Sequence, residues 1–254
     1  MRRVWTIFLL LSAAAPAAAE PPAPAPAGPD EAAAVQFADG LFRRGIYDMA
    51  IKEYMLFLEQ FPTSALADAI WFRSGECYRE MGNRVAADRA YSRVQAMSGS
   101  AHRFRAVLRR AELFAAAGQP ESAAGLLQAL LADSPPADVA ADALFRLAGA
   151  LDAMGRPADV APVYERLLRE HPGSPFEPYA WLALGTLAAE RPDGAAKAEA
   201  WLTRAAEKAG DARVAAEAWF QLGHLHYRGS NYVKSAYAFD QLLTRFGSDL
   251  RAES

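Results

Sequence analysis

The chain has 254 residues, of which 52% are hydrophobic and 22% charged, and its formal net charge is −3. This composition is typical of a folded, soluble protein and excludes an intrinsically disordered one. The slightly acidic balance gives no electrostatic reason to expect nucleic acid as a partner.

Residues 1–19 have the features of an export signal. Arg2 and Arg3 precede an apolar run, and the small residues before Glu20 suit a signal peptidase. We expect cleavage near Ala19 and a periplasmic location. The arginine pair also leaves a twin-arginine signal open, although the residues after it fit that pattern poorly. No cysteine stands at the cleavage site, which argues against a bacterial lipid anchor, and no later segment is long and apolar enough to span a bilayer.

Residues 20–29 are rich in proline and alanine and predict an extended linker. The folded part is expected to begin at residue 30, with Asp30 as the N-cap of the first helix. Residues 34–62 then predict two amphipathic helices joined at Gly45 and ended by Pro62. No segment shows the period-two alternation of a β-strand, so the chain is predicted to be all-α.

The helix pair is repeated along the chain. A small residue of the first helix recurs six times, at Ala38, Gly75, Ala111, Ala148, Gly185 and Gly223. The spacings are 37, 36, 37, 37 and 38 residues, and so steady a period indicates a repeat architecture. We place the repeats at about 31–64, 68–101, 104–137, 141–174, 178–212 and 216–249.

Other positions recur in phase with the small residue. A glycine follows it by seven residues in the first four copies, where it is expected to end the helix with a positive φ. The second helix carries a small residue and then, four places on, a large one: Tyr54, Tyr91, Leu127 and Tyr164. The fifth copy has a longer turn, and the sixth is expected to be shifted slightly at residues 229–232.

Together these residues resemble the tetratricopeptide repeat (TPR): an aromatic residue, a small one, Gly-x-Tyr, an alanine with Tyr four places later, and a closing proline. The resemblance covers about residues 31–247 and is similar in style to exported bacterial members, such as an outer-membrane assembly lipoprotein and a Tol-associated cell-division coordinator. It implies a right-handed α-solenoid of about six helix–turn–helix repeats, with the first helices lining a concave groove.

The resemblance also implies which side chains face the groove. They form the candidate peptide-binding site: Phe72, Arg73, Glu76, Arg109, Glu112, Phe145, Arg146, Phe220, Gln221 and His224.

Three of these residues form a row that we call the arginine ladder: Arg73, Arg109 and Arg146. One hypothesis is that the ladder binds an acidic segment or a terminal carboxylate. The alternative is ordinary pairing within each helix, of Arg73 with Glu76, Arg109 with Glu112 and Arg146 with Asp142. The apolar row, which includes Phe72, Phe145 and Phe220, is likewise either repeat core or ligand contact.

The sequence offers no catalytic motif, and we expect neither enzymatic activity nor a cofactor or metal. The single cysteine, Cys77, is interpreted as a buried helix residue. The predicted function is a protein–protein interaction scaffold of the cell envelope that binds a peptide segment or helix. A fixed structural subunit of an envelope complex is the alternative, and an enzyme with an unrecognised site is a remote one. Apolar residues of the last helix suggest self-association through the C-terminal repeat.

Overall fold

The computed structural model describes residues 28–252, and this part of the chain consists of helices and short turns. The predicted signal peptide and most of the predicted linker lie outside the described residues. The helices within them are α1 (Pro29–Arg43), α2 (Tyr47–Gln60), α3 (Ala67–Glu80), α4 (Arg84–Ala96), α5 (Arg103–Ala116), α6 (Pro120–Ala132), α7 (Ala137–Ala153), α8 (Pro157–Glu170), α9 (Glu177–Ala189), α10 (Ala195–Lys208), α11 (Ala212–Arg228) and α12 (Tyr232–Ala252).

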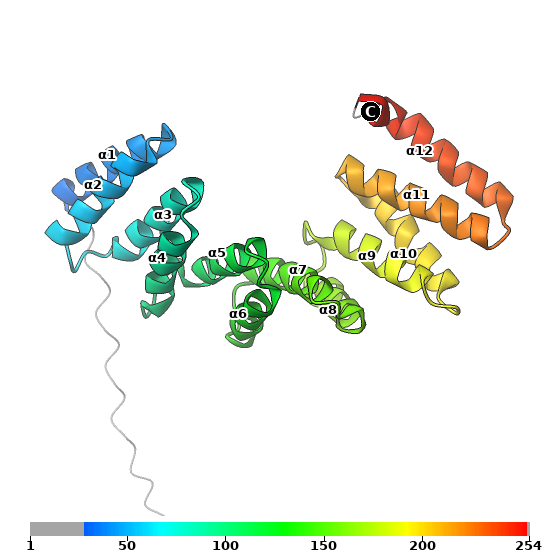
Figure 1. The fold of residues 1–254 in the computed structure, drawn as a ribbon, viewed down its shortest axis with the longest axis horizontal. Helices are drawn as coiled ribbons and strands as arrows, with labels where there is room; N and C mark the ends of the chain where they lie inside the picture. The colour runs from blue at the N-terminus through cyan, green and yellow to red at the C-terminus, as the bar shows by residue number, and fades with distance from the viewer. Residues whose placement is uncertain (1–27, 253–254) are drawn as a thin grey trace, which may run out of the picture.

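Consecutive helices pack against each other as six pairs, and the pairs follow an arc (Figure 1). Helices α3, α5, α7 and α9 lie on the inner side of the arc, and α4, α6, α8 and α10 lie on its outer side. Each helix touches mainly its neighbours in sequence, which is the arrangement of an α-solenoid. The first helices of these repeats therefore line the concave side of the arc, as the resemblance implied.

The turns within the first four pairs depend on glycine. Gly45, Gly82, Gly118 and Gly155 all have positive φ, between 68° and 74°, which residues with a Cβ adopt at a cost. In the sixth pair the equivalent residue is Ser230, which takes a φ of 59°. The sixth turn therefore keeps the register of the first four, and the small shift expected at residues 229–232 is not seen.

Glycine precedes the first residue of both α1 and α10. The N-cap of α1 is Gly28, and Asp30 lies inside the first turn, so its assignment as the N-cap was wrong. A carboxylate there still interacts favourably with the partial positive charge of the helix start. The long fifth turn ends at Gly194, whose backbone lies so close to the carbonyl of Ala188 that a Cβ would collide with it.

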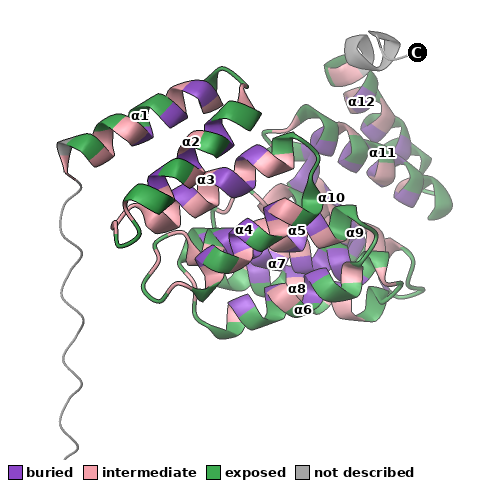
Figure 2. Cartoon of the chain, turned by 60° about the vertical axis from the view of Figure 1, so that its left-hand side comes forward, coloured by how far each residue is buried: buried purple, intermediate pink, exposed green. Residues whose placement is uncertain are grey.

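Within the described residues the core lies between the helices as four clusters of buried apolar side chains, and buried residues are purple in Figure 2. The small residue of each first helix is buried and lets the second helix approach. At Gly75 the approach is so close that an added Cβ would lie 2.5 Å from the ring of Tyr91, and at Gly223 it would lie 2.5 Å from the ring of Phe239. Cys77 is fully buried, as predicted, and its burial, followed by the charge of Glu76, raises its pKa to about 12.

Helix α12 leaves several large side chains exposed, among them Tyr232, Tyr237 and Leu243. It continues as far as Ala252. None of the described helices combines the length and apolar composition that a bilayer span requires.

Candidate functional site

The arginine ladder lies on α3, α5 and α7 and links successive repeats. Arg73 pairs with Asp39 of α1 at 3.0 Å, and Arg109 pairs with Glu76 of α3 at 3.0 Å. Arg146 continues the pattern by pairing with Glu112 of α5 at 2.7 Å. Each arginine therefore contacts an acid on the first helix of the preceding repeat.

Pairing within a helix accounts for only part of this network. Arg109 also contacts Glu112, and Arg146 also contacts Asp142 at 2.5 Å. Arg73, by contrast, pairs with Asp39, so the expected pair with Glu76 was wrong. The geometric reason is that Glu76 is already held by Arg109 and Arg79.

Two buried tyrosines, on the second helices of the first two repeats, donate hydrogen bonds to the acids of those repeats. Tyr54 donates to Asp39 at 2.7 Å, and Tyr91 donates to Glu76 at 2.5 Å. Burial, and then these hydrogen bonds to carboxylates, raise the pKa of both phenols well above the ordinary value. The hydroxyls are therefore neutral donors that fix the position of each carboxylate.

The ladder ends after the fourth repeat, which has no acid at the position that would pair with the next arginine. The position of Glu76 and Glu112 is occupied by Gly149 in the fourth repeat, and the next arginine position is Ala183. Arginine and acid are thus present together at three repeat junctions and absent together at the fourth. This is the pattern expected if each arginine needs the acid of the preceding repeat.

The ladder arginines remain accessible, since their side chains are between 32% and 39% exposed. Burial acts to lower the pKa of Arg109, but Glu112 and Glu76 outweigh it, so its pKa is raised. A half-exposed guanidinium that is held in place by carboxylates can still donate hydrogen bonds to a ligand.

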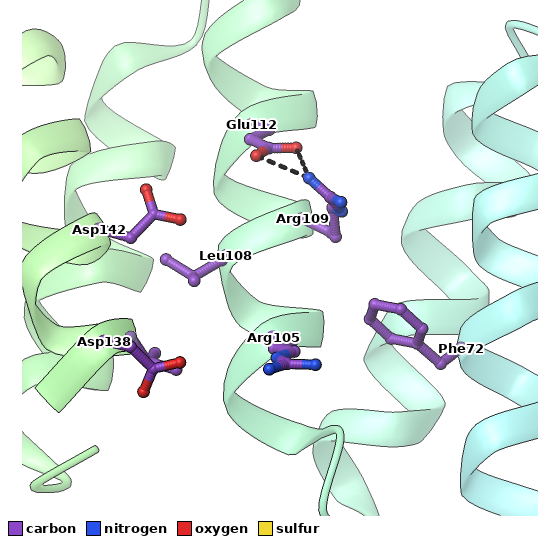
Figure 3. A pocket seen from close by; sticks show the side chains of 8 residues that line it. Phe72, Arg105, Leu108, Arg109, Glu112, Asp138 and Asp142 are labelled. Carbon is purple, nitrogen blue, oxygen red and sulfur yellow. Dashed lines mark hydrogen bonds and ion pairs between the residues drawn. The ribbon is translucent and has the colours of Figure 1, made fainter. Parts of the chain in front are cut away.

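A cavity of about 300 Å³ adjoins the ladder between α3, α5 and α7. Figure 3 shows Phe72 on one side, Asp138 and Asp142 on the other, and Arg105 and Arg109 between them. The floor includes Leu108. Apolar surface flanked by both signs of charge suits a polypeptide segment, which offers side chains and backbone groups together.

Phe72 and Phe145 are partly buried and held by other aromatic rings. Phe72 stacks on His102 with centroids 5.2 Å apart, and Phe145 stacks on Phe176 at 4.8 Å. Both residues thus contribute to packing between repeats, and Phe72 also lines the cavity.

The remaining candidate residues form a separate group on α11. Phe220 is 41% exposed and contacts His224 edge-to-face, with centroids 4.4 Å apart. Gln221 donates to Glu217 of the same helix. The structure therefore brings together the candidates of repeats two to four and leaves those of repeat six apart from them.

Four residues of the site were not among the predicted ones. Two pair with ladder arginines and two line the cavity: Asp39, Asp142, Arg105 and Asp138. Asp39 stands in the same repeat position as Glu76 and Glu112, so comparing the arginine row with the acids one repeat earlier would have found it. Arg105 and Asp138 lie four residues before Arg109 and Asp142, so following the same helix faces one turn toward the N-terminus would have found them.

Within residues 28–252 no group of three or more His, Cys, Asp or Glu side chains is arranged to hold a metal ion.

Comparison with known proteins places the chain in a family. The tetratricopeptide repeat matches residues 108–175 and 145–213 in one form and residues 69–96 in another, which together exceed half of the chain. No curated protein matches the chain.

Several solved structures share the fold at low sequence identity. PilF of Pseudomonas aeruginosa has a TM-score of 0.63 at 17% identity, over 88% of this chain and 97% of PilF. PilW, a type IV pilus biogenesis factor, has a TM-score of 0.60 at 15% identity, over 87% of this chain and 96% of PilW. YrrB, a TPR protein with an unusual peptide-binding site, has a TM-score of 0.56 at 14% identity, over 75% of this chain and 91% of YrrB.

The repeat matches, the paired helices and the concave inner wall agree, and the chain belongs to the tetratricopeptide repeat family.

Proposed function

We propose that this protein is a non-enzymatic interaction scaffold that binds a segment or helix of a partner protein in its concave groove. The observation that carries the proposal is the partly exposed arginine ladder beside the cavity at Phe72, Leu108 and Arg109. Proteins of this family are generally interaction modules, and YrrB is a TPR protein with a peptide-binding site.

A site-specific photocrosslinker tests this directly. We place it at Arg105, which is exposed in the groove, and in a control at Arg89, which is exposed on the outer helix α4. In intact cells the Arg105 probe should capture a specific protein, identified by mass spectrometry, and the Arg89 probe should not. Equal capture from both positions, or capture from Arg89 alone, would argue against a groove ligand.

We place this function in the bacterial cell envelope, after export directed by residues 1–19. The signal-like composition supports this, and PilW, which shares the fold, is a pilus biogenesis factor. N-terminal sequencing of the protein from fractionated cells should find a start near Glu20 in the periplasmic fraction. An intact N-terminus in the cytosol would contradict export.

A second candidate function is a fixed structural subunit of an envelope complex. The exposed apolar residues of α12, including Tyr232 and Leu243, favour it, because such a face suits a permanent contact or self-association. A complex that co-purifies at constant stoichiometry would favour this function, whereas salt-sensitive and reversible binding would favour the scaffold. Sedimentation that changes with concentration would indicate self-association.

A further inference from the structure

A second cavity, of about 390 Å³, lies between the third and fourth repeats beside the end of the ladder. Its walls are mostly small or apolar, and its charged residues are Glu112 and Arg146. The lining residues include Ala111, Ala123, Leu127, Gly149, Ala150 and Ala153.

One reason for this cavity is a missing tyrosine. In the second repeat the ring of Tyr91 lies against Gly75, and its hydroxyl reaches Glu76 at 2.5 Å. The first repeat has the same arrangement between Tyr54 and Asp39. In the third repeat the tyrosine position is Leu127, which has neither the ring nor the hydroxyl to reach the acid.

The other reason is a missing side chain on the facing helix. Gly149 of α7 stands at the repeat position that holds Glu76 and Glu112 in the two preceding repeats. A Cβ added to Gly149 would meet no atom within 4 Å, so the space beside it is open. Two departures from the repeat pattern, at Leu127 and Gly149, thus open the same cavity.

Glu112 retains an acceptor site here. Its Oε1 accepts from Arg109 and forms an ion pair with Arg146, whereas its Oε2 accepts from Arg109 among the described residues. A carboxylate offers about four acceptor positions, so Oε2 has room for a further donor. At Asp39 and Glu76 the further donor is the tyrosine hydroxyl of the same repeat.

The two arginines on Glu112 limit which donor fits. Two positive charges beside one carboxylate disfavour a lysine or arginine from a ligand. An aliphatic side chain would fill the space but would give the remaining acceptor position of Oε2 no donor. A neutral aromatic donor satisfies both the apolar walls and the acceptor, as Tyr91 does within the second repeat.

We propose that this cavity is a specificity pocket for a phenol, supplied by a tyrosine of the segment that binds in the groove. The phenol hydroxyl donates to Oε2 of Glu112, and the ring lies over Leu127 between α5 and α7. The involvement of a polypeptide rests on the proposed function, whereas binding of a phenol does not.

The test uses the full chain with p-cresol as the probe and toluene as the matched compound that lacks a hydroxyl. Binding is followed by NMR through the methyl groups of Ala111, Ala123 and Ala150. We expect p-cresol to shift these methyls and to bind about tenfold more tightly than toluene, because only p-cresol satisfies the carboxylate. Equal affinities for the two compounds would overturn the assignment of a phenol.

Variants then test the place of binding. Gly149→Gln fills the cavity from α7, where the structure has open space, and should weaken p-cresol at least about tenfold. The matched control is Gly125→Gln on α6, which is also a helical glycine with open space around it and should bind as the wild type does. Leu127→Tyr places a tyrosine ring of the protein itself in the cavity and should also abolish the binding of p-cresol. Unchanged binding in Gly149→Gln and Leu127→Tyr would overturn the proposal.

The outcomes separate this pocket from the proposed function. If a crosslinked partner binds Gly149→Gln as tightly as the wild type, the pocket proposal fails and the scaffold function stands. If p-cresol binds as expected but the Arg105 probe captures no protein, the pocket stands and the scaffold function fails.

Discussion

Arg73 pairs with Asp39 across a repeat junction, at 3.0 Å, although Glu76 lies one turn away on its own helix. The same relationship recurs at the next two junctions, where Arg109 meets Glu76 and Arg146 meets Glu112. The ladder thus couples adjacent repeats while leaving the guanidinium groups partly exposed to the groove.

This coupling predicts a measurable interaction energy between Arg73 and Asp39. A double-mutant cycle with Arg73→Ala and Asp39→Ala should give about 0.5 kcal/mol, because pairs of this exposure are screened by water. Urea unfolding measures it. The exposed pair at the start of α8, the N-cap Arg156 with Asp159, serves as a comparison and should give less. A coupling of zero between Arg73 and Asp39 would show that the junction pair is not formed in solution.

Tyr91→Phe should destabilise the protein by about 1–2 kcal/mol, because it removes a hydroxyl that donates to the partly buried carboxylate of Glu76. Tyr164→Phe is the matched control, since the position equivalent to Glu76 in its repeat is Gly149. It should be nearly neutral. Equal effects of the two substitutions in thermal or urea unfolding would contradict the role given to the Tyr91 hydroxyl.

The raised pKa values of Tyr54 and Tyr91 predict a loss of stability at alkaline pH. Their contribution is fully present below the unfolded-state pKa of about 10 and falls as pH rises above it, because the unfolded chain then loses protons that the folded chain keeps. At pH 11 the loss should be on the order of 1 kcal/mol for each tyrosine. Unfolding by urea at pH 8 and pH 11 measures this, and Tyr91→Phe should show a smaller pH dependence than the wild type.

Glycine-to-alanine substitutions should have opposite effects at two helical positions. At Gly75 an added Cβ would lie 2.5 Å from the Tyr91 ring, so Gly75→Ala should destabilise the protein despite the better helix propensity of alanine. At Gly125 the space is open, and Gly125→Ala should stabilise α6 by about 0.5–1 kcal/mol. If thermal unfolding shows stabilisation at both positions, the close contact at Gly75 is not present in solution.

The repeat period predicted the fold, because the small residue, the turn glycine and the large residue of the second helix all serve contacts within one pair. Gly45, Gly82, Gly118 and Gly155 have the expected positive φ for that reason. Ser230 was harder to predict, since a serine only occasionally takes that conformation and only the surrounding helices require it here.

The site was less predictable, because it depends on contacts between repeats. The sequence suggested that Arg73 pairs with Glu76, the nearest acid along its helix, whereas the packing of successive repeats places Asp39 3.0 Å from Arg73. Packing between repeats also brings Arg105 of α5 and Asp138 of α7 to one cavity. The open space beside Gly149 likewise depends on a residue of another helix, Leu127 of α6.

The proposed function requires that the groove bind a partner segment through the ladder. The most direct measurement is the affinity of the crosslinked partner segment for the wild type and for Arg109→Glu. Arg89→Glu on α4 is the control, and circular dichroism confirms that each variant keeps its helices. We expect at least about a tenfold loss of affinity for Arg109→Glu and none for Arg89→Glu. Equal affinity of a folded Arg109→Glu variant and the wild type would contradict it.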